Sequence, residues 1–424
     1  MRASFLLPFA LLAAPLFAQT PTADTPVPAA SALKTPSGAT ATNAGTTPLP
    51  TVGYKDNGGG FYLQSADESI RIGMMGYIQA VQRNYASKAY DKYRTDYPLD
   101  FTVKRARVAF MATFEKMYDM YFEFDGAPIP AASGPTAAAP NAPTEVTSAF
   151  GVVEAKFVAH LLEDRVRFTI GKFIMPFSAE NGRSARAYDT VERYMVENAM
   201  FALPAIDSQY GTMLSGKEFD KSFEWYLSVL NGNARTSRNT EDDNGSKEVA
   251  ARIVYNVSNV SLGLGYDTNQ NANAQSLKLT DLTGTLYNSA KITGRRQGWS
   301  PDFYWKMGDF SFRTEYMTMM WKDSDVRLFG GFVQMAYFLV GDDKGGFQPL
   351  ARWEQANLKS SKSLTVKGAD ELQSLTLGWQ WFLNGNVRNQ FNFISTRGNE
   401  VVVNTAYDKH KTLYSILNEF QIKF

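Results

Sequence analysis

The C-terminal segment, residues 412–424, alternates between apolar and polar side chains and ends on an aromatic residue. One face is apolar apart from Asn418 and carries Tyr414, Ile416, Phe420, Ile422 and Phe424. The other face is mostly polar and carries Leu413, Ser415, Leu417, Glu419, Gln421 and Lys423. Successive side chains of a strand point to opposite faces. One face therefore suits lipid and the other suits water, which is the pattern of a strand in a transmembrane β-barrel.

The same period of two continues from about Phe61 to Phe424 and predicts about sixteen strands. Short turns alternate with long connections, apart from one brief connection near Asp323. The long connections are residues 86–99, 127–147, 176–209, 232–246, 269–298, 359–370 and 398–411. Short turns on one rim and long loops on the other are typical of bacterial barrels, in which the turns are periplasmic. We therefore predict an all-β fold, a transmembrane antiparallel β-barrel, over residues 61–424.

The N-terminal residues predict export. Arg2, an apolar stretch over residues 5–17 and the small Ala18 indicate a secretory signal peptide over residues 1–18. Residues 19–60 begin with a Thr-, Ala- and Pro-rich stretch that has little apolar surface to bury, and we predict a disordered leader there. The chain has no Cys, which excludes thiolate chemistry and fits an oxidising periplasm. The bacterial outer membrane is the predicted location, and its lipids are the predicted surroundings.

The positions of charged residues indicate which face of each strand lines the lumen, because a charge facing lipid near the midplane costs roughly 2–4 kcal/mol. The predicted inward cations are Arg105, Arg107, Lys156, Arg165, Arg167, Arg252, Arg313, Arg352, Arg388 and Lys423. The predicted inward anions are Asp119, Glu123, Asp125, Glu154, Glu315, Glu354 and Glu419. Cations are therefore in modest excess on the predicted lumen face.

These charges allow two interpretations. Arginine binds oxyanions with two parallel donors, so a row of arginines along the lumen would offer shallow anion sites. Alternatively, the cations pair with neighbouring carboxylates across strands and brace a weakly selective pore. The whole chain has 43 Lys and Arg against 42 Asp and Glu, so its charge balance does not indicate nucleic-acid binding.

Four blocks give the chain a resemblance to a known family. They are Val103–Val108 (VKRARV), Ile170–Glu180 (IGKFIMPFSAE), Gly331–Asp342 (GFVQMAYFLVGD) and Phe347–Glu354 (FQPLARWE). In this order and spacing the chain resembles the phosphate-selective porin O and P family of the outer membrane. The resemblance implies a sixteen-stranded barrel, a homotrimer, and an inward-folded third extracellular loop that narrows the pore. It also implies passage of phosphate or other small anions along lumenal Arg and Lys residues.

By this resemblance, residues 176–209 form the constriction loop. Its cations are Arg183, Arg186 and Arg193, and its candidate acidic residues are Glu180, Asp189, Glu192 and Glu197. Cations and carboxylates on opposite sides of an opening would create a transverse field that orients small solutes. Alternatively, ion pairs hold the loop against the wall. Lys172 falls on the lipid face near the extracellular rim, where a bulge could turn it inward or its ammonium could reach the headgroups.

The sequence offers little for catalysis. The chain has two histidines, His160 beside a short turn and His410 in the last long loop, which the topology places at opposite rims. It has no Gly-rich phosphate loop, no His-x-Glu pattern and no Cys cluster, so we predict no cofactor, no metal and no enzyme activity. Passive diffusion of small hydrophilic solutes with an anion preference is the predicted function. A weakly selective pore or a structural or adhesin barrel is the alternative, and an outer-membrane hydrolase is less favoured.

Overall fold

The computed structural model describes most of the chain from residue 49 to the C-terminus. The described residues are 49–55, 59–85, 99–127, 151–202, 206–232, 245–280, 282, 286–361, 364, 370–398, 400–403, 406–409 and 412–424. The predicted signal peptide and most of the predicted leader lie outside these residues. Among the described residues, no helix is both long and apolar enough to cross a membrane.

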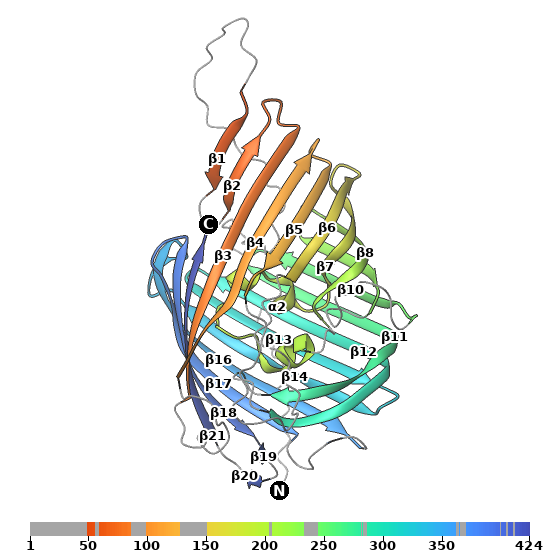
Figure 1. The fold of residues 1–424 in the computed structure, drawn as a ribbon, viewed down its shortest axis with the longest axis vertical. Helices are drawn as coiled ribbons and strands as arrows, with labels where there is room; N and C mark the ends of the chain where they lie inside the picture. The colour runs from red at the N-terminus through yellow and green to blue at the C-terminus, as the bar shows by residue number, and fades with distance from the viewer. Residues whose placement is uncertain are drawn as a thin grey trace, which may run out of the picture.

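Nineteen strands share one antiparallel sheet, and sixteen of them form a closed ring (Figure 1). Their bounds are β3 (Ile70–Tyr85), β4 (Leu99–Phe114), β5 (Tyr118–Asp125), β6 (Gly151–Leu161), β7 (Val166–Ile174), β8 (Ser208–Glu218), β9 (Phe223–Leu230), β10 (Glu248–Val257), β11 (Val260–Thr280), β12 (Leu286–Met307), β13 (Phe310–Trp321), β14 (Val326–Tyr337), β16 (Gly345–Ser360), β17 (Glu371–Phe382), β18 (Val387–Gly398) and β21 (Thr412–Lys423). Pairing of β21 with β3, from Lys423 opposite Tyr77 to Ser415 opposite Tyr85, closes the ring. The predicted β-barrel is confirmed.

Each strand exposes alternate side chains outward. On β21, Tyr414, Phe420 and Ile422 are exposed, whereas Glu419 and Gln421 are buried inside. This alternation confirms which residues face lipid and which face the lumen at the C-terminus, because apolar side chains are stable in contact with acyl chains.

A short hairpin precedes the ring. β1 (Thr51–Lys55) pairs with β2 (Gly60–Gln64), and β2 pairs with the first residues of β3. Residues 51–55 fall inside the segment predicted to be disordered, so that prediction is wrong for them. These residues are ordered because β1 pairs with β2, and β2 pairs with β3 just beyond the end of β21, where β3 would otherwise present an open edge.

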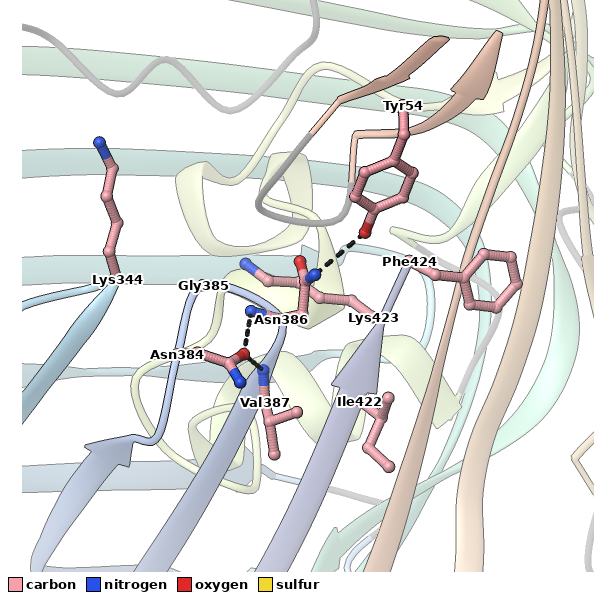
Figure 2. A pocket seen from close by; sticks show the side chains of 9 residues that line it. All are labelled: Tyr54, Lys344, Asn384, Gly385, Asn386, Val387, Ile422, Lys423 and Phe424. Atoms are coloured by element: carbon pink, nitrogen blue, oxygen red, sulfur yellow. Dashed lines mark hydrogen bonds between the residues drawn. The ribbon is translucent and has the colours of Figure 1, made fainter.

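Figure 2 shows the resulting periplasmic junction, where an open hollow is lined by the hairpin, the turn 384–387 and the end of the chain. The Asn386 amide donates to the Tyr54 hydroxyl at 3.0 Å. The Phe424 amide donates to the Gly76 carbonyl, and the Gly76 amide donates to the Phe424 carbonyl. These hydrogen bonds of the hairpin and the chain end therefore stabilise the seam of the barrel, which is the place where β21 meets β3.

Two strands extend far beyond the ring. The sequence predicts that β11 ends near residue 268, that β12 begins near residue 299, and that a loop over residues 269–298 joins them. Instead, their antiparallel pairing continues to Thr280 opposite Leu286. The prediction of a loop over residues 269–298 is wrong because the segment alternates apolar and polar side chains and pairs with itself as a hairpin. Figure 1 shows the far ends of both strands curving inward over the extracellular end.

The described residues of the third extracellular loop, 175–202 and 206–207, lie inside the ring. It carries α2 (Ala179–Gly182), the 3₁₀ turn η1 (Ala185–Ala187) and α3 (Met195–Ala202). The Ser178 hydroxyl accepts a hydrogen bond from the Asn181 amide and caps α2. Met195, Val196 and Met200 are fully buried against the inner wall.

The extracellular part of the interior is apolar. Along β13, the inward residues change from Arg313 and Glu315 to Met317, Met319 and Trp321. These side chains join one buried cluster with α3 and with inward residues of the neighbouring strands. This apolar part of the interior gives the third loop a surface to pack on, which stabilises it by roughly 1.5–3 kcal/mol for each buried large side chain.

Candidate functional site

Wall cations anchor the third loop through its backbone. The Lys104 ammonium donates to the Val191 carbonyl, and the Arg352 guanidinium donates to the Glu192 carbonyl at 3.0 Å. Arg388 donates to the carbonyls of Tyr188 and Arg186 at 3.0 and 3.1 Å. These residues lie on β4, β16 and β18, so the loop is held from well-separated parts of the wall. Many of the N–H donors that were expected to bind solute anions therefore bind carbonyl groups of the protein itself.

The carboxylate of Asp189 in the third loop is shared by two arginines. Arg183 approaches it at 3.3 Å from within the loop, and Arg313 approaches it at 3.2 Å from β13. Gln334 on β14 also donates to it, at 2.8 Å. Burial raises the pKa of Asp189, but the two guanidinium groups outweigh burial and hold that pKa well below its usual value. The carboxylate is therefore charged and fastens the loop to two strands.

The carboxylate of Glu192 in the third loop is also shared by two cations. The Lys104 ammonium lies 2.8 Å from it and the Arg83 guanidinium 3.7 Å from it. Burial raises the pKa of Glu192, but the charges of Lys104 and Arg83 outweigh burial and lower it. Lys104 also interacts with the Glu419 carboxylate, whereas Arg83 pairs with Glu192. Arg83 keeps 28% of its side chain exposed and is the more accessible of the two cations.

Several predicted inward cations pair with carboxylates. Arg107 lies 3.0 Å from Glu123 and 2.9 Å from Asp125. Other pairs are Lys156 with Glu154, Arg252 with Asp302 (2.7 Å), Arg352 with Glu354 (3.1 Å) and Arg183 with Glu180 (3.3 Å). Arg193 pairs with Glu197 at 3.1 Å inside the loop and lies over the Phe201 ring. The geometry thus supports the bracing interpretation for these residues.

Arg165 and Arg167 lie at the periplasmic rim. Arg165 keeps 68% of its side chain exposed and pairs with Glu218, whereas Arg167 donates twice to Asp164 at 2.8 Å. The His160 ring lies between Asp119 and Asp164, at 2.7 and 2.6 Å. His410 lies outside the described residues. Among the described residues, no group of acidic, His or Cys side chains is arranged to hold a metal ion.

Arg105 and Arg388 differ from the other predicted wall cations. Neither forms an ion pair with a carboxylate in the part of the chain that the structure describes. Arg105 donates to Gln79 at 2.7 Å, and Arg388 donates to Gln380 and Gln421. Both are buried beside the third loop. On the loop itself, Arg186 donates to the Met75 sulfur at 3.4 Å.

Sequence reasoning missed Lys104 and Arg83. The β3–β4 register shifts between Gln79 and Ala80, which pair with Arg105 and Val103 and leave Lys104 as an extra residue. Such a bulge turns two successive side chains to one face, so a strict period of two assigns Lys104 to lipid. Arg83 lies at the extracellular end of β3. The neighbouring cations Lys104 and Arg105 were the available signal, because two adjacent charges cannot both avoid lipid on a regular strand.

Lys172 shows the opposite outcome. The β6–β7 register has no shift at this position, so Lys172 stays on the outer face. Its ammonium donates to the Val152 carbonyl at 2.6 Å and lies 5.7 Å from the Tyr210 ring centre. Of the two alternatives, the structure has the side chain reaching along the outer rim.

The family model for phosphate-selective porin O and P matches residues 78–422, nearly all of the ring just described. The chain belongs to the phosphate-selective porin O and P family. This porin is therefore a bacterial outer-membrane diffusion channel and not an enzyme. No curated protein sequence is significantly similar to it.

Solved structures share the fold at low identity. An anion-selective porin from Comamonas acidovorans is 11% identical, with 84% of this chain and 100% of that chain covered and a TM-score of 0.54. The outer-membrane channel DcaP of Acinetobacter baumannii is 8% identical, with 85% and 99% covered and a TM-score of 0.54. A trimer form of OmpT from Vibrio cholerae is 12% identical, with 84% and 100% covered and a TM-score of 0.53.

Proposed function

We propose that this porin lets small hydrophilic solutes diffuse passively across the outer membrane, with a modest preference for anions such as phosphate. The observation that carries the preference is the pair of cations, Arg83 and Lys104, that share the carboxylate of Glu192. Arg83, the partly exposed cation of this group, attracts anions beside the third loop without trapping them. A shallow site is required for flux, because a solute that binds tightly leaves slowly.

Two comparisons support parts of this proposal. A porin of the same fold is described as anion-selective, and the family is named for phosphate. OmpT of Vibrio cholerae has a trimer form, which supports a homotrimer here. The signal peptide over residues 1–18 stays a prediction that agrees with an outer-membrane location.

A weakly selective pore is the second candidate function. It is favoured by the ion pairs of Arg107, Lys156, Arg252 and Arg352, whose charges are balanced by nearby carboxylates. Balanced pairs contribute little to the field in the lumen. The two candidates differ in the sign and size of the selectivity, not in the mechanism of transport.

Planar-bilayer recording separates the two candidates. Under a potassium chloride gradient, the proposal expects a zero-current potential displaced toward that of chloride. Phosphate added at millimolar concentration is expected to reduce chloride current. A potential near zero favours the weakly selective pore, and a potential displaced toward potassium contradicts the anion preference. Undiminished chloride current in phosphate contradicts phosphate as a permeant anion.

A further inference from the structure

The extension of β11 and β12 beyond the ring is an amphipathic hairpin. We define the cap hairpin as residues 272–280 of β11 and 286–294 of β12. Its side chains alternate: Leu277, Leu279, Ala290 and Ile292 are buried, with exposed fractions of at most 3%, on one face. Ser276, Lys278, Lys291 and Thr293 are exposed on the other. Lipid does not cover the outer face of this hairpin, because that face is polar and charged.

The apolar face of the cap hairpin packs into the extracellular end of the barrel. Leu277, Leu279 and Ile292 belong to the same buried cluster as Trp321, Leu328, Leu358, Leu372 and Leu413, which come from five different wall strands. The cluster also contains Met195 and Met200 of the third loop. The hairpin therefore lies between the inner wall and solvent, above the third loop.

The cap hairpin reaches the opposite side of the extracellular end. Ala290 forms an isolated antiparallel bridge with Leu364, in the connection between β16 and β17. β12 also lies against β19 (Glu400–Val403), in the connection between β18 and β21. In Figure 1 the curved ends of β11 and β12 run toward β19. The hairpin thus crosses from its own strands to strands that are not its neighbours in the ring.

The base of the cap hairpin has an irregular ladder. The β11–β12 register shifts between Asn269 and Ala272 and again between Ala272 and Gln275. Gly294 has a φ of +81°, a conformation that glycine adopts without strain. Below this point, Arg296 is fixed by Asp267 at 2.9 Å and by Glu248 at 2.7 Å. The hairpin therefore has a fixed base, an irregular ladder above the base, and a far end that lies outside the ladder of the ring. A hinged element is built from such parts.

We propose that the cap hairpin is a lid that closes the extracellular mouth and swings about residues 269–275 and Gly294 to admit solute. The described conformation is the closed one, in which the apolar face of the lid is buried. Opening exposes part of that face to water, so burial of its apolar side chains favours the closed state. The proposal depends on the protein being a channel but not on its anion preference.

A disulfide between lid and rim tests this proposal directly. The chain has no Cys, so Ala290→Cys/Leu364→Cys introduces a single possible pair across an existing bridge. Oxidised channels are expected to show a several-fold lower open probability in planar bilayers, and a reductant is expected to restore it. The Ala290→Cys single variant under the same treatment is the matched control. Equal open probability in the oxidised and reduced double variant overturns the lid, and failure of the two thiols to cross-link overturns the closed position.

Variants of the two faces provide an independent test. Leu277→Ser/Leu279→Ser weakens the packing of the lid and is expected to raise the open probability several-fold. Ser276→Ala/Lys278→Ala changes the outer face at neighbouring positions and is expected to leave it unchanged. The gel mobility of unheated and heated protein verifies that each variant has folded. Equal effects of the two double variants on a folded channel would contradict the proposal.

Discussion

The Lys104 ammonium lies 2.8 Å from the Glu192 carboxylate and so joins the wall strand β4 to the third loop. The same ammonium donates to the Val191 carbonyl. This contact depends on a bulge that turns Lys104 away from lipid. It places beside the third loop a cation that a regular strand would not provide.

We expect the charges around Glu192 to set ion selectivity. Arg83→Gln/Lys104→Gln leaves Glu192 without its two cations, so the zero-current potential in a salt gradient should move toward potassium. Glu192→Gln should move it toward chloride, because the two cations then lack their counter-charge. Lys116→Gln, on an exposed periplasmic turn, is the control. If the opposite charge changes move the potential in the same direction, disruption of the loop is the cause and the assignment is wrong.

We expect Arg296 to be essential for stability. Its guanidinium lies between the carboxylates of Asp267 and Glu248, and all three side chains are buried. Arg296→Gln leaves two buried carboxylates uncompensated and should cost about 3–5 kcal/mol. Arg295→Gln removes an exposed pair with Asp323 and should cost less than about 1 kcal/mol. Urea unfolding followed by tryptophan fluorescence measures both, and equal losses would contradict this account.

We expect Gly76 to be required at the seam. A Cβ at this position would lie 2.6 Å from the Phe424 ring and 2.7 Å from the Arg107 carbonyl. Gly76→Ala should therefore displace the chain end and cost roughly 1–3 kcal/mol. Gly345→Ala, where no atom lies within 4 Å of the added Cβ, is the matched control. The temperature at which the folded gel band disappears should fall in the first variant only.

We expect Asp164 to contribute to stability in a defined pH range. Hydrogen bonds from Arg167 are the main cause that lowers the pKa of Asp164 to about 2. Because the folded-state pKa lies below the unfolded value of about 3.9, the stabilisation is present above about pH 4 and is lost as pH falls toward about 2. The carboxylate is half-exposed, so its contribution should stay below about 1 kcal/mol.

The matching measurement compares thermal unfolding at pH 6 and pH 2.5. Asp164→Asn should lose less stability on acidification than the unchanged protein, because the titrating group is gone. Glu163→Gln, on the same turn, should behave like the unchanged protein. A variant Asp164→Asn that loses as much as the unchanged protein would show that other carboxylates account for the whole effect.

Much of the barrel follows from local pattern. Tyr414, Phe420 and Ile422 lie outside, and Glu419 and Gln421 lie inside, as the period of two predicts. The pairing of Arg107 with Glu123 and Asp125 also follows, since neighbouring strands joined by a short turn bring these residues together. The cap hairpin was missed because residues 269–298 begin with a polar, Asn-rich stretch typical of a loop.

By itself, the sequence determined the ring: a strand with one apolar and one polar face is stable only between lipid and a hydrated or packed interior, and that requirement is local. Only the tertiary structure decided what fills the ring. Asp189, Glu192 and the backbone carbonyls of the third loop meet Arg313, Lys104 and Arg388 through contacts between residues far apart in the chain. These contacts in three dimensions decide which cations bind oxygen atoms of the loop and which are left to interact with a solute.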